Sequence, residues 1–156
     1  MDAFSVRTKI MIGGGMDALA QRLHRVFLVT DKFMDESGKT NYVTDRLLRN
    51  SGEFKIFSDV QADPDIATVT RGVEQILEFQ PDAVVAFGGG SAIDAAKAIV
   101  FFAARERDMR DCKFIAIPTT SGTGSEVSRF AVITDREKGV KYPLVEDSLL
   151  PDIAIL

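Results

Sequence analysis

Residues 83–104 read AVVAFGGGSAIDAAKAIVFFAA, and this stretch decides the fold. Residues 83–87 form a short apolar run that ends at three glycines, as a central strand of a parallel sheet does. Small and apolar residues then dominate up to residue 104, which predicts a buried helix. Ser91 and Asp94 have the spacing of a capping box, so we expect Ser91 to cap the start of that helix.

Gly88, Gly89 and Gly90, called the glycine turn below, lie where this strand meets the N-terminus of the helix. Because glycine has no Cβ atom, a ligand can approach the backbone closely. The first N–H groups of a helix are unpaired and carry partial positive charge, so the turn is suited to a phosphate group. It is not the usual dinucleotide fingerprint, because residue 93 is Ile, and no Gly-Lys-Ser/Thr follows as in a Walker A loop. A plain strand–helix turn, with glycines for tight packing, is the alternative.

Length and composition limit the classes of function. The chain has 156 residues, the size of one domain, and 46% of them are hydrophobic. Its formal net charge is −4 without any run of Lys or Arg, which argues against a nucleic-acid partner. Cys112 and His24 are the only cysteine and histidine, which excludes a disulfide framework and a cysteine metal site. No apolar run reaches the roughly 18 residues of a membrane span and no signal-peptide core is seen, so we expect a reducing, cytoplasmic location and no membrane partner.

Residues 25–30, RVFLVT, predict a second buried strand, which ends at Asp31. In doubly wound folds an acid at a strand end can accept hydrogen bonds from a ribose 2′-OH. The same carboxylate would repel a 2′-phosphate, which favours NAD over NADP as the cofactor. Capping of the following loop is the alternative role for Asp31.

Strands alternate with helices along the remaining chain, which predicts parallel β-α-β units. Further strands are expected at residues 7–12, 54–57, 114–117 and 153–156, helices at 16–23 and 43–48, and a loop at 33–40. Asp63 is expected to cap a helix that has Pro64 at its first position. Residues 129–134 and 141–145 predict a hairpin around a turn at 135–139. The expected fold is α/β, a Rossmann-like parallel sheet flanked by helices, with a β-hairpin near the C-terminus.

Residues 119–125, TTSGTGS, called the threonine loop below, follow the strand at 114–117. Five of these seven residues carry hydroxyl groups: Thr119, Thr120, Ser121, Thr123 and Ser125. The carboxyl ends of parallel strands meet at the sheet edge where ligands bind, so this loop predicts the second wall of a nucleotide cleft beside the glycine turn. A solvated turn is the alternative. Lys141 in the hairpin can reach a phosphate or a ribose, although an exposed surface lysine is the commoner case.

Four motifs, GGGSAIDAAKAI, AIPTTSGTGSEV, ITD…KGVKYPLV and PDIAIL, resemble those of the iron-dependent (group III) alcohol dehydrogenases, in particular the propanol dehydrogenase type. The resemblance covers essentially the whole chain. It implies an N-terminal α/β domain that holds NAD(P) and a C-terminal helical domain that holds a divalent metal, usually iron, with one Asp and three His. Residues 1–156 correspond to the first domain only, with the metal domain absent, so we expect no metal ligand here. The single histidine agrees, because it cannot supply three.

The resemblance also implies roles for residues at the sheet edge. The glycine turn and Ser91 match the family's pyrophosphate loop. Asp94 matches an acid near the nicotinamide ribose, and Asp31 matches the acid that selects NAD in many members.

Further cofactor contacts are implied outside the glycine turn. Thr119, Thr120 and Thr123 match a loop that covers the adenine and ribose side of the cofactor. Asp63 and Lys141 match two more contact positions, although capping alone would also explain Asp63.

For the parent enzyme, the resemblance implies reversible hydride transfer between NAD and a small primary alcohol or aldehyde, with Fe²⁺ or another divalent metal as Lewis acid. This domain would position the cofactor without supplying a catalytic residue, so we expect the 156 residues alone to be inactive. A homodimer or larger homo-oligomer is implied as well. The propanol dehydrogenase type also raises association with a bacterial microcompartment, although residues 1–12 show no clear targeting helix.

Three alternatives stay open at this point. The first is the cofactor domain of a glycerol dehydrogenase or dehydroquinate synthase-like enzyme. The second is a free-standing nucleotide-binding module without catalysis. The third is a phosphate-binding domain for another nucleotide.

Overall fold

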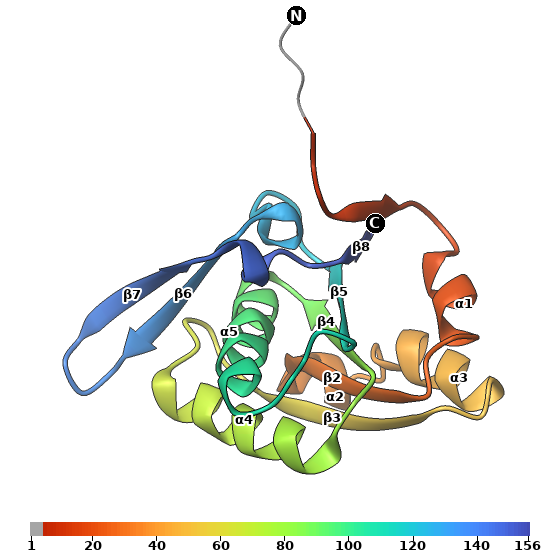
Figure 1. Ribbon diagram of the computed structural model, residues 1–156, viewed down its shortest axis with the longest axis horizontal. Helices are drawn as coiled ribbons and strands as arrows, with labels where there is room; N and C mark the ends of the chain where they lie inside the picture. The colour runs from red at the N-terminus through yellow and green to blue at the C-terminus, as the bar shows by residue number, and fades with distance from the viewer. Residues whose placement is uncertain (1–4) are drawn as a thin grey trace, which may run out of the picture.

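Six parallel strands form the central sheet, in the order β1-β8-β5-β4-β2-β3 (Figure 1). The computed structural model describes residues 5–156, and these strands are β1 (Lys9–Met11), β2 (Arg25–Asp31), β3 (Glu53–Val60), β4 (Ala83–Gly88), β5 (Lys113–Pro118) and β8 (Ile153–Ile155). Every residue of β4 is buried, as the opening stretch of sequence predicted. The expected α/β fold with a parallel sheet is confirmed.

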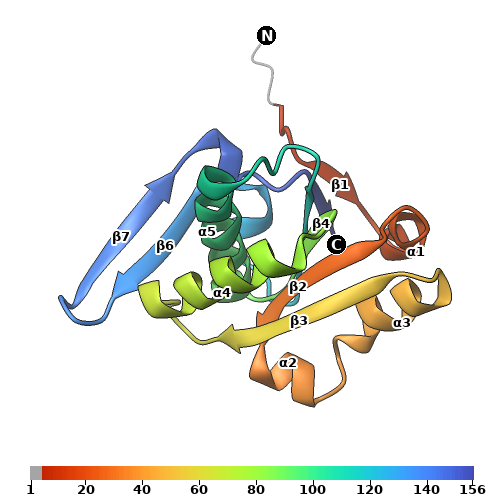
Figure 2. The same ribbon diagram turned by 60° about the horizontal axis from the view of Figure 1, so that its bottom comes forward.

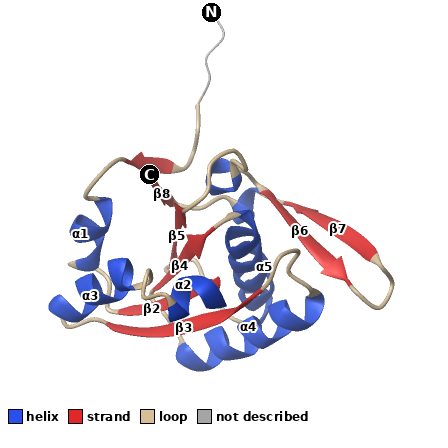
Figure 3. Ribbon diagram, turned by 180° about the vertical axis from the view of Figure 1, so that it is seen from behind, coloured by secondary structure: helices blue, strands red, loops and turns tan. Residues whose placement is uncertain are grey.

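Helices cover both faces of this sheet (Figure 3). The helices are α1 (Gly15–Ala20), α2 (Lys32–Glu36), α3 (Asn41–Arg49), α4 (Ile66–Phe79) and α5 (Gly90–Glu106). Side chains along β2 alternate between two cores: Phe27 and Val29 pack with α4 and α5, whereas Val26 and Leu28 pack with α1 and α3. Burial on both faces explains why the strands read as continuous apolar runs.

The order of the strands reverses between β2 and β4. The chain passes from β2 outward to β3 and then crosses to the other side of β2, where β4 and β5 follow. Ligands of open α/β sheets bind outside the carboxyl ends of the strands at such a point. The Thr30 hydroxyl of β2 donates a 2.7 Å hydrogen bond to the Phe87 carbonyl of β4, which ties the two strand ends together. Asp31 at the end of β2 and Gly88 at the end of β4 therefore share this edge.

The predicted hairpin is a separate two-stranded antiparallel sheet of β6 (Phe130–Asp135) and β7 (Val140–Val145), flanked by two short 3₁₀ turns, η1 (Ser125–Val127) and η2 (Asp147–Leu149). It extends away from the central sheet beside α4 and α5 (Figures 1 and 2). The Thr134 N–H donates to the Pro64 carbonyl at 2.9 Å, so the hairpin is fastened to the loop before α4.

The start of α5 differs from the prediction. The helix begins at Gly90 with Gly89 at the N-cap, and no side chain caps it, so the expected capping box of Ser91 and Asp94 is not formed. The Asp94 carboxylate is used instead by donors from the threonine loop and from β6. These donors bind both oxygens of Asp94, so neither is left to complete a capping box. Glycine at the N-cap lowers helix stability by only a few tenths of a kcal/mol.

The start of α4 also differs, because Asp65 rather than Asp63 is the N-cap. Asp65 Oδ1 accepts the Thr68 N–H at 2.8 Å, and Oδ2 accepts the Arg136 Nε–H at 2.8 Å. Asp63 has a φ of +54°, which is left-handed rather than the extended conformation of an N-cap. The contact with Arg136 of the hairpin favours Asp65 as the N-cap. The local sequence around residues 63–68 cannot predict this long-range contact.

Two expectations concern the N-terminus and membranes. The expectation about a targeting helix concerns residues 1–12: residues 5–12 contain no helix, and residues 1–4 lie outside the described part of the chain. None of the helices within residues 5–156 is long and apolar enough to cross a membrane.

Asp65→Ala is expected to lower the free energy of unfolding by about 1–2 kcal/mol, because it removes the N-cap of α4. The Thr68 N–H, more than Arg136, lowers the pKa of Asp65 from its ordinary 3.8. A lowered carboxyl pKa stabilises the fold above that ordinary value, and the contribution is lost as the pH falls through the folded value. Urea denaturation should therefore show a smaller difference between wild type and variant at pH 3 than at pH 7.

Asp63→Asn is the matched control for this capping assignment. Its 3.2 Å ion pair with Lys141 is exposed and Asn tolerates a left-handed φ, so the loss should stay below about 0.5 kcal/mol. A loss equal to that of Asp65→Ala would contradict the assignment.

Candidate functional site

The first glycine of the turn lies against the carboxylate of Asp31. A Cβ atom on Gly88, whose φ is +151°, would lie 2.9 Å from the Ala92 Cβ, so this position needs glycine. The same Cβ position is 3.7 Å from Asp31 Oδ2. Asp31 Oδ1 accepts the Met34 N–H at 2.8 Å and caps α2, a helix at the start of the predicted loop 33–40. Asp31 therefore caps the next segment with one oxygen and faces the glycine turn with the other.

The threonine loop packs directly on the glycine turn. A Cβ atom on Gly89 would lie 3.3 Å from Thr120 Oγ1, and one on Gly90 would lie 3.1 Å from Thr123 Cγ2. The Thr119 N–H donates to the carbonyl of the first glycine at 2.9 Å. The structure thus brings the three predicted threonines to the glycine turn.

A polar pocket of about 360 Å³ opens beside the N-terminus of α5. It is lined by Gly90, Ser91, Asp94, Thr123, Ser125, Ser128 and Phe130. The first N–H groups of α5 have no partner within the helix and carry partial positive charge. An anionic group would therefore be stabilised at this end of the pocket.

Asp94 and Lys97 meet in a network on the inner side of this pocket. The Ser125 hydroxyl donates to Asp94 Oδ1 at 2.7 Å, and the Val132 N–H donates to Oδ2 at 3.2 Å. Lys97 is fully buried, and its Nζ donates to Ser125 Oγ at 3.1 Å. Burial lowers the pKa of Lys97 to about 8, while the charges of Asp94 and Glu126 oppose that shift. One hydroxyl thus bridges a buried ammonium and a carboxylate.

Asp63 and Lys141 lie together in a different place. They form a 3.2 Å ion pair that joins the loop after β3 to the hairpin, and both side chains are about 60% exposed. No hydrogen bond among the described residues joins either side chain to the glycine turn. The candidate residues therefore fall into two groups, one at the glycine turn and one at the hairpin.

An apolar pocket adjoins the threonine loop on the other side of the sheet edge. It is lined by Met34, Lys39, Tyr42, Phe87, Ile117, Pro118, Thr119, Ile155 and Leu156. The rings of Tyr42 and Phe87 stack there with centroids 6.3 Å apart. Such a surface suits a flat, apolar group more than a charged one.

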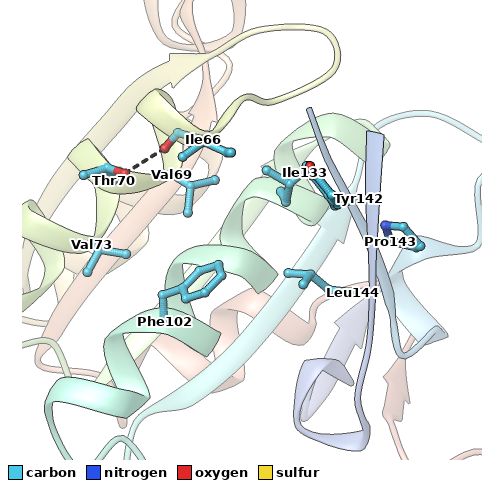
Figure 4. Close-up of a pocket in the computed structure, with 9 residues that line it drawn as sticks. All are labelled: Ile66, Val69, Thr70, Val73, Phe102, Ile133, Tyr142, Pro143 and Leu144. Atoms are coloured by element: carbon cyan, nitrogen blue, oxygen red, sulfur yellow. Dashed lines mark hydrogen bonds between the residues drawn. The ribbon is translucent and has the colours of Figure 1, made fainter. Parts of the chain in front are cut away.

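A second apolar pocket, of about 630 Å³, lies between α4, α5 and the hairpin. Figure 4 shows side chains of all three converging on it, including Val69, Phe102 and Leu144. It shares no lining residue with the glycine turn or the threonine loop. Its walls are apolar apart from Thr70 and Tyr142, and it lies away from the glycine turn, so we do not include it in the candidate site.

The family model of the iron-containing alcohol dehydrogenases matches residues 8–156. The chain belongs to the iron-containing alcohol dehydrogenase family. The 1-propanol dehydrogenase PduQ of Citrobacter freundii is 44% identical over 158 residues, which cover 100% of this chain and 42% of that protein. The predicted resemblance to this family, and to its propanol dehydrogenases, is confirmed.

Solved structures of the same family have the same fold. The iron-containing alcohol dehydrogenase of Thermococcus thioreducens superposes with a TM-score of 0.85 at 31% identity, over 99% of this chain and 46% of that one. Sulfoacetaldehyde reductase of Bifidobacterium kashiwanohense, solved in complex with NAD⁺, gives 0.83 at 32% identity, over 99% and 46%. The chain spans less than half the length of these relatives and corresponds to the family's cofactor-binding N-terminal domain.

Iron gives the family its name, so a donor set for a metal ion is relevant to the described residues. Within residues 5–156, no group of three or more His, Cys, Asp or Glu side chains is arranged to hold a metal ion.

Sequence reasoning missed Lys97 and its partners Ser128 and Phe130, and named Ser125 only as a hydroxyl residue of the threonine loop. The available signal was one basic residue in a helix of small and apolar residues, where a lysine needs a buried partner. Its partners lie 28 to 33 positions further along the chain, so no local pattern identifies them.

Gly90→Ala is expected to loosen the threonine loop, because the new Cβ would press on Thr123 Cγ2. We expect the opening free energy at the Thr119 amide to fall by about 1 kcal/mol, seen as roughly fivefold faster hydrogen exchange. Adding Thr123→Ser removes Cγ2 and leaves contacts of 3.4 and 3.5 Å, so the double variant should return toward wild type. Equal exchange in the single and double variants would show that Thr123 does not carry the effect.

Proposed function

We propose that this domain binds NAD at the carboxyl ends of β2 and β4, as the cofactor domain of an alcohol dehydrogenase that interconverts a small primary alcohol and its aldehyde. The observation that carries the proposal is the position of Asp31 Oδ2 beside Gly88, at the point where the strand order reverses. A nucleotide that crosses this point meets an acid, a side-chain-free turn and a helix N-terminus in succession.

The glycine turn and Ser91 are the proposed pyrophosphate site. The missing Cβ atoms let the diphosphate approach the backbone, and the first N–H groups of α5 face it. Because no side chain caps α5, those N–H groups do not have to exchange an existing partner for the phosphate.

The adenosine half is proposed to lie over β2 and the threonine loop. Asp31 Oδ2 would accept from the ribose 2′-OH, and a 2′-phosphate in its place would be repelled. The apolar pocket with Tyr42 and Phe87 offers a flat surface for adenine next to Thr119. The hydroxyls of Thr120 and Thr123 would then donate to or accept from the ribose and phosphate oxygens.

Asp94, Asp63 and Lys141 are proposed as further contacts. Asp94 lines the polar pocket, where lone pairs left after its bonds with Ser125 and Val132 can accept from the nicotinamide ribose. Asp63 and Lys141 would have to exchange their mutual ion pair for cofactor contacts, and their exposure makes that exchange cheap.

When bound, NAD supplies the hydride acceptor, and this domain orients it. The described residues hold no metal donor set, so the 156 residues alone are expected to give no turnover. The small alcohol as substrate is suggested by relatives such as the 1-propanol dehydrogenase. Assembly as a homodimer or larger oligomer and a cytoplasmic location belong to the same proposal.

Calorimetric titration with NAD, NADP and ATP tests the proposed cofactor. Wild type is expected to bind NAD at least tenfold more tightly than NADP or ATP, since losing one hydrogen bond to a charged group costs roughly 1.5–3 kcal/mol. Asp31→Asn keeps an oxygen that can cap α2 but loses the charge, so it should weaken NAD, improve NADP and leave the melting temperature almost unchanged.

Asp31→Ala is the matched comparison, because it removes the cap and the cofactor contact together. Equal affinities of wild type for NAD and NADP, or an unchanged ratio in Asp31→Asn, would overturn the role of Asp31. Tighter binding of ATP than of NAD would point to a different nucleotide.

A further inference from the structure

Lys97 is a fully buried lysine in the middle of α5, the helix that begins at the glycine turn. A buried ammonium group is costly unless hydrogen bonds replace its water. Among the residues three and four positions away on α5, Ile93, Val100 and Phe101 are apolar, and Asp94 faces Lys97 as an opposite charge. The hydrogen bonds of Nζ all go to residues outside this helix.

All of the partners of Lys97 belong to one segment, residues 125–130, called the clamped segment below. Nζ lies 2.7 Å from the Phe130 carbonyl, 2.8 Å from the Ser128 carbonyl, and 3.1 Å from both Ser125 Oγ and Ser128 Oγ. An ammonium group has three protons for these four acceptors, so every proton is used. The clamped segment joins the threonine loop to β6.

The Ser125 hydroxyl passes this constraint on to Asp94. Its single proton goes to Asp94 Oδ1 at 2.7 Å, so its lone pair is left to accept from Lys97. Lys97 thereby orients Asp94 through Ser125. Asp94 lies one turn before Lys97 on α5 and lines the polar pocket.

The threonine loop is held by hydrogen bonds at its two ends, and two glycines between these ends face open space. Its first end is held by the bond from the Thr119 N–H to the glycine turn, and its second end is the clamped segment. Gly122 and Gly124 in between have φ of +102° and +65°, and a Cβ on either would meet nothing within 4 Å. The position of the second half of the loop therefore depends on what holds the clamped segment.

We propose that Lys97 is a positioning residue for the cofactor site: its ammonium group holds residues 125–130 on α5 and so keeps the threonine loop over the glycine turn and Asp94 in the polar pocket. This inference rests on the proposed function. Lys97 lines neither of the two pockets described at the site. Its proposed role is to hold the threonine loop, which forms one wall of the proposed cleft.

The proposal predicts a dependence of cofactor binding on pH. A neutral amine has only two protons for the four acceptors, so loss of the charge releases at least one bond. The charged groups that face Lys97 are Asp94 on α5 and Glu126 in η1; Glu126 Oε2 is buried without a hydrogen-bond partner among the described residues. Burial brings the pKa of Lys97 to about 8, so the charge is present at pH 7 and largely lost at pH 9.

The test compares wild type, Lys97→Met and Lys97→Arg by NAD titration at pH 7 and pH 9, and by hydrogen exchange at the Val132 amide. Wild type should lose affinity by about threefold or more between pH 7 and pH 9. Lys97→Met should bind NAD about tenfold more weakly at pH 7, show no pH dependence and exchange Val132 faster. Lys97→Arg stays charged at both values, so it should recover part of the affinity and show no fall at pH 9.

Lys138→Met, in the exposed turn of the hairpin, is the control for loss of a lysine and should match wild type. If Lys97→Met does not fold, Ser128→Ala removes one of the four acceptors and should reduce NAD affinity with the lysine intact. Wild-type affinity and pH profile in the folded variants would overturn the positioning role alone. Failure of wild type to bind NAD would overturn the proposed function, and the role of Lys97 with it.

Discussion

The structure depends on a close approach of three segments that only glycine permits: the end of β4, the start of α5 and the threonine loop. A Cβ atom on Gly88 would meet α5, and one on Gly90 would press on the threonine loop. The same absence of side chains leaves α5 without a side-chain cap and keeps its first N–H groups available. The constraint that lets the chain turn from strand to helix is thus the constraint that makes the edge suitable for a phosphate.

A second constraint joins the hairpin to the sheet domain. The hairpin is a separate two-stranded sheet, and two-stranded sheets are marginal on their own. Polar anchors fix it at both ends: Lys97 holds the segment that enters β6, and Arg136 at the far turn binds Asp65 at the start of α4. Both anchors are charged groups with several partners, so they set the orientation of the hairpin as well as its contact with the body.

Much of the fold could be predicted because the central strands are buried on both faces of the sheet. Such strands appear in the sequence as unbroken apolar runs, here residues 25–30 and 83–87. Helix starts were predicted less well. Ser91 with Asp94 has a good capping pattern, but Asp94 accepts from the distant Ser125 instead. Asp63 with Pro64 also has one, but the N-cap is Asp65, which binds the distant Arg136. The glycine turn, Asp31 and the threonines could be located because each follows a strand. Lys97 stands out as a lysine among small and apolar helix residues, but its role could not be predicted because its partners are 28 to 33 positions away in the sequence.

At Asp31, capping of α2 is compatible with the proposed recognition of the cofactor. A carboxylate has two oxygens, and here Oδ1 accepts from the Met34 N–H while Oδ2 lies toward Gly88. The bond that caps α2 also fixes the rotation of the side chain, and that rotation directs the second oxygen at the glycine turn. Asp94 differs, because Ser125 donates to one of its oxygens and the Val132 amide to the other, which orients the whole carboxylate at the polar pocket. For the proposed function, the structural hydrogen bond at Oδ1 of Asp31 is therefore the means by which Oδ2 would be oriented for the ribose.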